Sequence, residues 1–298
     1  MALDQALTKI QIDTVKATPI QSLKRDRDRA ARVSLRLLAC RLQIGLRIEE
    51  IFQYYLDYST DPHNQSRCIQ MLLESEALSE NARAKFHRYA RSSNSGLVLL
   101  HLASALQRLP HEARWLIAEA LASRGEFAND PVLPLMVWYG IEPAVPADPD
   151  KAVALAESTK MPKLRTFIAR RLTHLLAQQP EAANKVVELL GRVGSAESQL
   201  NVLTGMKDAL AGMRKAPPPA AWASVSKKLN DGGNESVRQA VREVSVVFGD
   251  GRAIDEVKKI AAARGSDSES RRQAIRSLVE ARAAGLAPLL QGLLDDRD

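Results

Sequence analysis

The sequence has few aromatic residues and few cysteines. Three Trp, five Tyr and five Phe occur among 298 residues. A β-sandwich or β-barrel would contain more, because strands favour aromatic and β-branched side chains. The two cysteines, Cys40 and Cys68, exclude a disulfide scaffold and a cysteine-rich metal site. These shortages favour an all-α fold.

Long apolar runs are also missing. The longest nearly apolar stretch, residues 132–141, has ten residues and includes Pro134, whereas a membrane-spanning helix needs about 20. The first ten residues include Asp4 and no continuous apolar segment, so they do not have the pattern of a secretory signal. We therefore expect no membrane span and, by default, a cytoplasmic location.

The motifs that usually carry catalysis do not occur. The sequence has no Gly-rich loop ending in Gly-Lys-Ser/Thr, no G-x-S-x-G elbow, no H-E-x-x-H helix and no C-x-x-C-H haem attachment. The five histidines do not cluster with either cysteine at the spacing of metal ligands. We therefore predict no catalytic, cofactor or metal site, and we expect that the protein is not an enzyme.

Helical periodicity is the strongest positive signal. Apolar residues such as Val237, Val241 and Val244 recur at the three- and four-residue spacing of one helix face. Comparable points in successive helices, each the first of a pair, are separated by 34, 39 and 34 residues; they are Arg165, Gln199, Arg238 and Arg272. Two-helix units with this period are typical of an α-solenoid. We predict stacked antiparallel helix pairs in a right-handed superhelix over residues 60–298, with residues 1–58 as a helical cap or incomplete repeat.

Acid–proline pairs mark helix starts. Asp61-Pro62, Asp130-Pro131 and Asp148-Pro149 each place an acid at the N-cap and a proline at the first helical position. We expect the aromatic residues on apolar faces to form the core: Trp138, Tyr139, Phe167 and Trp222. We also expect two acid–arginine pairs to bridge neighbouring repeats: Asp61 with Arg67, and Asp267 with Arg272.

The net charge of +7 is unevenly distributed. Lys and Arg exceed Asp and Glu by three in residues 1–58 and by six in residues 161–298, whereas residues 59–160 carry an excess of two acids. Such a basic surface either attracts nucleic acid or is an ordinary solvated helix face. The candidate basic residues are Arg27, Arg29, Arg32, Lys163 and Arg170.

Several stretches resemble one family. They are Asp61-Pro62-His63 with Arg67, the Leu102–Pro110 segment, the Leu133–Pro143 block, Phe167-Ile168-Ala169-Arg170-Arg171 and, more weakly, Leu203–Met206 with Trp222. Together they resemble the HEAT-repeat region of planctomycete-type membrane-bound-dehydrogenase-like proteins that also carry a c-type cytochrome domain. The chain lacks that family's propeller strands and haem motif, so the resemblance implies a repeat segment without electron transfer.

The resemblance also affects the expected context. It implies that the chain is a fragment ending where a further repeat would begin, and an exported location if the parent protein is exported. From these observations we expect a non-catalytic helical scaffold that binds another protein or another module of its parent chain. The alternatives are a nucleic-acid-binding repeat protein that uses the basic helices, and an accessory module beside a dehydrogenase or cytochrome domain.

Overall fold

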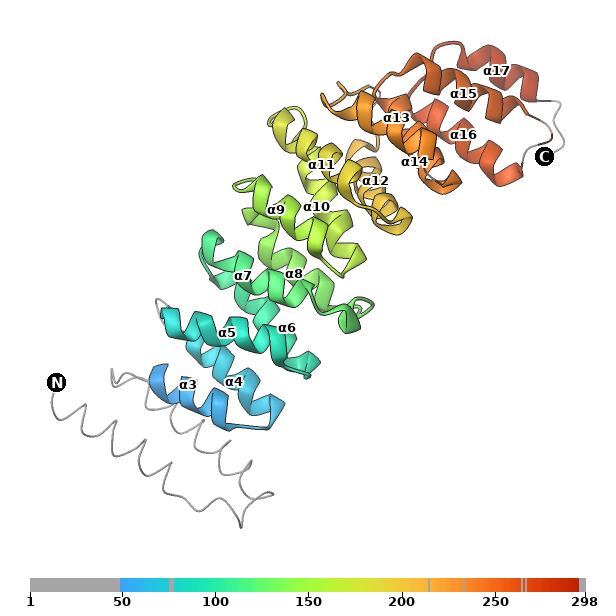
Figure 1. Cartoon of the computed structure of the whole chain (residues 1–298). Coiled ribbons are helices and arrows are strands. Elements are labelled where there is room, and N and C mark those ends of the chain that lie inside the picture. Colours follow the sequence, from blue (N-terminus) through green and yellow to red (C-terminus); the bar gives the residue numbers. More distant parts are fainter. Residues whose placement is uncertain are drawn as a thin grey trace, which may run out of the picture. The chain divides into compact units, whose positions relative to one another are not determined.

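Every regular element that the structure describes is a helix. The computed structural model describes residues 49–74, 78–213, 215–232, 234–263, 265 and 267–294 (Figure 1). These residues form fifteen α-helices and three short 3-10 helices, and they contain no β-strand. The all-α prediction is therefore confirmed. The predicted basic residues Arg27, Arg29 and Arg32 lie outside the described residues.

The chain divides into two compact units, the first ending at Ile141 and the second beginning at Glu142. The α-helices described in the first unit are α3 (Glu49–Tyr58), α4 (Pro62–Leu73), α5 (Glu80–Ser92), α6 (Gly96–Ala105), α7 (His111–Ala122) and α8 (Leu133–Ile141). Helix α4 packs against α3 and α6, α6 packs against α8, and α5 packs against α7. The predicted boundary near residue 58 falls inside this unit, between α3 and α4.

The second unit has two rows of helices. Its α-helices are α9 (Pro149–Ser158), α10 (Pro162–His174), α11 (Pro180–Arg192), α12 (Ala196–Leu210), α13 (Trp222–Gly232), α14 (Glu235–Val247), α15 (Gly251–Ala262), α16 (Ser268–Glu280) and α17 (Leu286–Leu293). Helices α10, α12, α14 and α16 contact one another in sequence, and we call them the even row. Helices α9, α11 and α13 contact one another in the same way.

The predicted helix starts at Asp61-Pro62 and Asp148-Pro149 are confirmed, whereas the one at Asp130-Pro131 is two residues early, because α8 begins at Leu133. Asp61 accepts a hydrogen bond from the His63 N–H at 2.9 Å, and Asp148 accepts one from the Lys151 N–H at 3.1 Å. Asp130 accepts a bond of 2.7 Å from the N–H of the first residue of α8. A carboxylate at this position satisfies amide groups that have no partner inside the helix.

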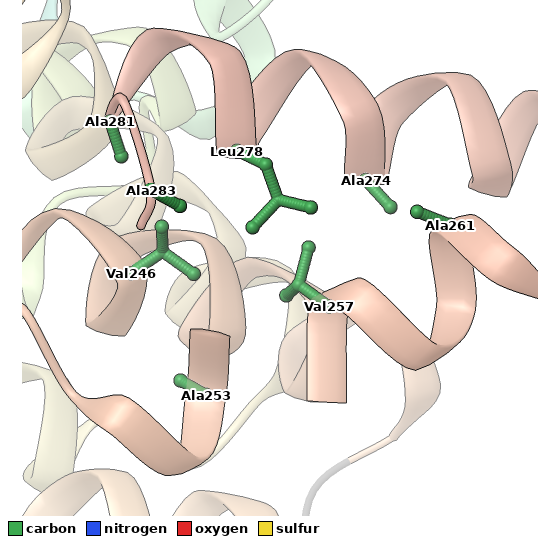
Figure 2. Close-up of a cluster of buried hydrophobic side chains, with 8 residues drawn as sticks. All are labelled: Val246, Ala253, Val257, Ala261, Ala274, Leu278, Ala281 and Ala283. Carbon is green, nitrogen blue, oxygen red and sulfur yellow. The ribbon is translucent and has the colours of Figure 1, made fainter. Parts of the chain in front are cut away.

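Small residues allow the helices to approach closely. Figure 2 shows the core between the end of α14, α15 and α16, which consists of Leu278 of α16, four valine or alanine residues from α14 and α15, and further alanines. In the even row, Gly205 of α12 lies against α10. A Cβ atom at Gly205 would lie 2.3 Å from the Thr166 carbonyl oxygen, so only glycine permits this contact.

The expected aromatic core is only partly correct. Trp222 is 4% exposed, its indole N–H donates to the Ser245 hydroxyl at 3.1 Å, and its ring meets Phe248 edge-to-face. Tyr139, in contrast, is 57% exposed, so its placement in the core is wrong. Trp138 is only half-buried. The reason is geometric: each residue turns the helix by about 100°, which takes both side chains away from the face that α8 buries.

Phe167 is also half-buried rather than fully buried. The buried face of α10 includes Leu164, Ile168 and Leu172, which follow one another at four-residue steps. Phe167 precedes Ile168 by one residue and therefore lies at the edge of this face. The prediction that it fills the core between repeats is wrong.

Candidate functional site

The predicted acid–arginine bridges between repeats are wrong. Asp61 and Asp267 each cap the helix that follows them. Arg67 donates to a glutamine three residues later in its own helix, at 3.3 Å, and Arg272 pairs with a glutamate three residues earlier, at 3.4 Å. An acid immediately before a helix can reach the amide groups of the first turn, which have no partner inside the helix. Asp61 and Asp267 therefore bond to their own helix and not to an arginine of a neighbouring repeat.

Other ion pairs connect helices that are neighbours within one row. In the second unit Arg192 of α11 pairs with Glu157 of α9 at 3.1 Å, and Lys207 of α12 pairs with Glu243 of α14. The partners lie 35 and 36 residues apart in the sequence. This separation agrees with the two-helix period that the sequence predicts, although the period pointed to different residues.

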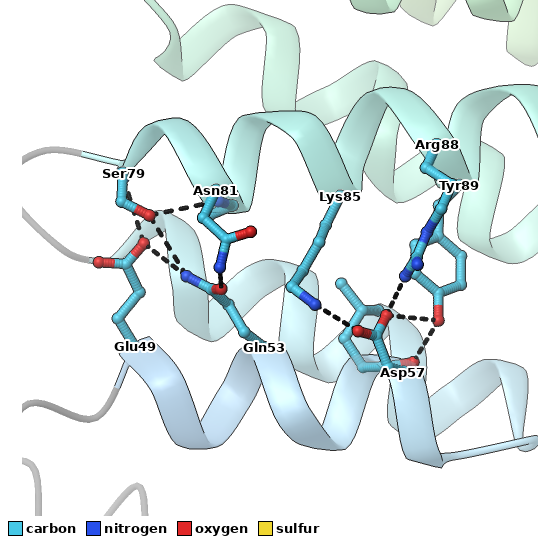
Figure 3. Close-up of polar contacts among 10 residues, drawn as sticks. Glu49, Gln53, Asp57, Ser79, Asn81, Lys85, Arg88 and Tyr89 are labelled. Atoms are coloured by element: carbon cyan, nitrogen blue, oxygen red, sulfur yellow. Dashed lines mark hydrogen bonds and ion pairs between the residues drawn. The ribbon is translucent and has the colours of Figure 1, made fainter.

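A polar network joins α3 to α5 (Figure 3). Asp57 of α3 pairs with Lys85 and Arg88 of α5, and the Tyr89 hydroxyl donates to the Leu56 carbonyl at 2.6 Å. Burial, with the nearby Asp57 carboxylate, raises the pKa of Tyr89 to about 12. Each of these groups has a partner in the adjacent helix, so the network joins two helices and presents no reactive group.

Side chains near helix starts also join consecutive helices. Arg165, the fourth residue of α10, donates from Nε to the Ala156 carbonyl and from a terminal nitrogen to the Thr159 carbonyl, both at 2.8 Å. These carbonyls are at the end of α9, where a helix leaves acceptors unpaired. Gln199, the fourth residue of α12, donates to the carbonyl of Val193 at 3.1 Å.

The same position in α16 is occupied by Arg271, not by Arg272 as the sequence alignment of repeats predicts. Arg271 is 5% exposed and donates to the Ala261 carbonyl at the end of α15, at 3.3 Å. Arg272 is exposed. The predicted register was therefore wrong by one residue at this repeat, because two adjacent arginines give no indication in the sequence of which one is buried.

A concave surface lies on the even row. Three cavities of about 290, 220 and 400 Å³ occur there, and Glu243 of α14 and Gln273 of α16 line all three. We call the surface they share the α14–α16 groove. Its central polar side chains are Lys207, Gln239, Glu243, Ser270, Gln273 and Ser277. The sequence pattern gives no sign that these residues share a groove, because polar side chains at helical spacing usually mark a solvated face.

The groove carries negative charge. Six acids line its cavities: Asp208, Glu235, Glu243, Asp267, Glu269 and Glu280. The cations that line the same cavities are Lys207 and Arg242. Hydrogen bonds from Arg242 and Arg238 lower the pKa of Glu235, and the Ser270 N–H lowers the pKa of Asp267.

The predicted basic residues of the second unit lie outside this groove. Lys163 and Arg170 are exposed on α10 and seven residues apart, so they lie two turns apart on one helix face. Neither lines one of the three cavities. Arg171 beside them pairs with Glu142 at 2.9 Å. The described residues thus provide a small basic surface on α10.

Groups with reactive chemistry are few among the described residues. The Cys68 thiol is buried, and burial raises its pKa to about 12. Burial lowers the pKa of His101, which lies 3.2 Å from the Gln70 amide nitrogen. Over the same residues, no group of three or more His, Cys, Asp and Glu side chains has a geometry that could hold a metal ion. None of the described helices is both long enough and apolar enough to cross a membrane.

Comparison with known proteins gives no relatives: the chain matches no family model, and no curated protein or solved structure matches it.

Proposed function

We propose that this protein is a non-catalytic helical-repeat scaffold that binds another protein, or another module of its parent chain, in the α14–α16 groove. As part of this proposal, the helices form antiparallel pairs that stack in a HEAT-like α-solenoid with a right-handed superhelix. Support for the repeats comes from the packing of alternate helices against one another and from the side-chain contacts between residues 35 and 36 apart. In repeat proteins, stacked units create extended binding surfaces.

The observation that carries the proposal is the continuity of the three cavities along one row of helices. Thr204 and Lys207 of α12, Gln239 of α14, and Ser270 and Gln273 of α16 come from successive helices of the even row and together line a single cavity. An extended partner segment that binds side chains of three helices would gain more contact area than one helix offers.

Site-specific crosslinking tests the proposal. A photoreactive amino acid replaces Thr204 in one variant and Gln273 in a second, and in a third control variant it replaces exposed Glu181 of α11. We expect the two groove variants to crosslink the same protein, and the purified partner to bind the unmodified chain at a Kd that groove substitutions weaken. Crosslinking from Glu181 alone, or a partner whose Kd is unaffected by groove substitutions, contradicts the proposal.

Nucleic-acid binding is the second candidate function, because α10 has no acidic residue and exposes Lys163 and Arg170. Two exposed cations give a small phosphate-binding surface, and we expect a random DNA duplex to bind in the non-specific range of about 10⁻⁴ to 10⁻⁶ M. A salt titration of binding tests this. Sub-micromolar affinity at physiological salt that is lost when Lys163 and Arg170 become glutamates would favour the nucleic-acid function.

A further inference from the structure

We propose that the occupant of the α14–α16 groove is an extended, cationic segment of a partner protein, with a lysine or arginine side chain bound at Glu243. This inference rests on the proposed function and adds the chemistry of the partner. It follows from the charge of the groove, the burial of Glu243 and the type of side chain on the groove walls.

Glu243 occupies the centre of the groove. Its side chain is 10% exposed, it lines all three cavities, and the Gln239 amide donates to it at 3.3 Å. Lys207 is its counter-ion, and the Lys207 side chain is far more exposed, at 39%. A buried carboxylate requires a cation, whereas an exposed lysine can return to water. An incoming lysine or arginine can therefore replace or join Lys207 at Glu243.

The groove walls suit an extended backbone. Ser270, Gln273 and Ser277 are separated by three and four residues, so they follow one face of α16. Hydroxyl and amide side chains both donate and accept hydrogen bonds, as the peptide groups of an extended chain require.

The charge of the groove disfavours an anionic occupant. Its cavities are lined by six acids and two cations, and two further arginines, Arg238 and Arg272, pair with the lining acids Glu235 and Glu269. The acids still exceed the cations by two, which disfavours the binding of phosphate groups there. The whole chain nevertheless carries +7, and this charge repels a polycation at long range. If a cationic peptide binds, the attraction must therefore come from the acids of the groove, because the net charge of the protein repels the peptide.

The test measures the fluorescence anisotropy of a short labelled peptide of alternating lysine and serine as the full-length chain is added at low salt. We expect Glu243→Gln to raise the Kd by about tenfold or more, which is about 1.4 kcal/mol in binding free energy. Lys207→Gln should lower the Kd by several-fold, because it removes the competing counter-ion. A charge-matched substitution on an exposed face of α7, Glu119→Gln, should leave the Kd unchanged.

The two groove variants control for stability, because both break the Lys207–Glu243 ion pair but have opposite expected effects on binding. Four outcomes would each overturn the inference. They are equal effects of the two groove variants on the Kd, an equal loss of affinity in Glu119→Gln, a preference for an alternating glutamate–serine peptide, and no saturable binding up to about 1 mM. A crosslinked partner that binds the groove independently of Glu243 would overturn it while the proposed function stands. If no partner crosslinks from the groove, the proposed function fails.

Discussion

Replacing Arg165 tests the idea that buried donors near helix starts hold consecutive helices together. In Arg165→Met the apolar stem is retained, but two carbonyls at the end of α9 lose donors that lie 2.8 Å away. Hydrogen bonds from a charged group contribute about 1.5–3 kcal/mol each, and removing a guanidinium that is 7% exposed also removes a desolvation cost. We expect the free energy of unfolding to fall by about 2–4 kcal/mol.

One matched control replaces an exposed arginine of the same helix, and the other is a more conservative substitution of Arg165 itself. Arg170→Met removes an exposed arginine from α10 and should change stability by no more than about 0.5 kcal/mol. Arg165→Gln should lose less than Arg165→Met, because Gln199 makes one such bond from the equivalent position of α12.

The assay combines urea unfolding with native-state hydrogen exchange, which reports the opening of α9 and α10 separately from the rest of the chain. We expect the Arg165→Met variant to exchange faster at the end of α9 in particular, because the carbonyls that lose their donors are there. Equal stability of the Arg165→Met and Arg170→Met variants, with unchanged exchange in α9, would refute the reasoning.

Three further predictions concern packing and titration. Gly205→Ala should lower the free energy of unfolding by about 1–3 kcal/mol through overpacking, whereas Gly292→Ala, where a Cβ atom meets nothing within 4 Å, should be neutral or stabilising in the same urea experiment. Trp222→Ala should lower the free energy of unfolding by about 3–5 kcal/mol. Trp138→Ala should lower it clearly less, since of these two side chains only Trp222 is buried. A larger loss of melting temperature for Trp138→Ala would contradict this prediction. The pKa of the Tyr89 hydroxyl is raised from 10.0 to about 12, so the stability that this hydroxyl contributes is complete below pH 10 and is lost as the pH rises toward 12. Tyr89→Phe should therefore make the free energy of unfolding depend less on pH between 10 and 12. An unchanged pH profile would contradict this prediction.

The sequence predicted most of what depends on local chemistry. Asp61 and Asp148 cap their helices as expected, because an acid before a helix start has only nearby amide groups to satisfy. The apolar face of α14 lies in the core as its spacing predicts, with Val237, Val241 and Val244 almost fully buried. These features require information from only a few adjacent residues.

The features that the sequence did not predict depend on the neighbouring helix. Tyr139 is a large aromatic residue on an apolar helix, yet it is exposed because it lies on the side of α8 opposite the face that packs against α6 and α7. Arg271 and Arg272 are identical as residues, and only the position of α15 decides which one is buried. The α14–α16 groove is a clear case, because its lining comes from helices 30 or more residues apart in the sequence.

The packing within the even row explains how close packing and a groove occur side by side. Where α12 meets α10, Gly205 brings the backbones together and leaves no space for a ligand. Between α14 and α16 the outward residues are polar and long, such as Glu243 and Gln273, and they line cavities instead of a dry contact. The buried faces and the donors near helix starts hold the helices together, and the ion pair of Glu243 with Lys207 adds to the contact between α14 and α12, whereas exposed residues beside the groove can change without altering how the helices pair. If the groove binds a partner as we propose, its exposed acids can therefore be substituted to change the preferred partner while the helix pairing is kept.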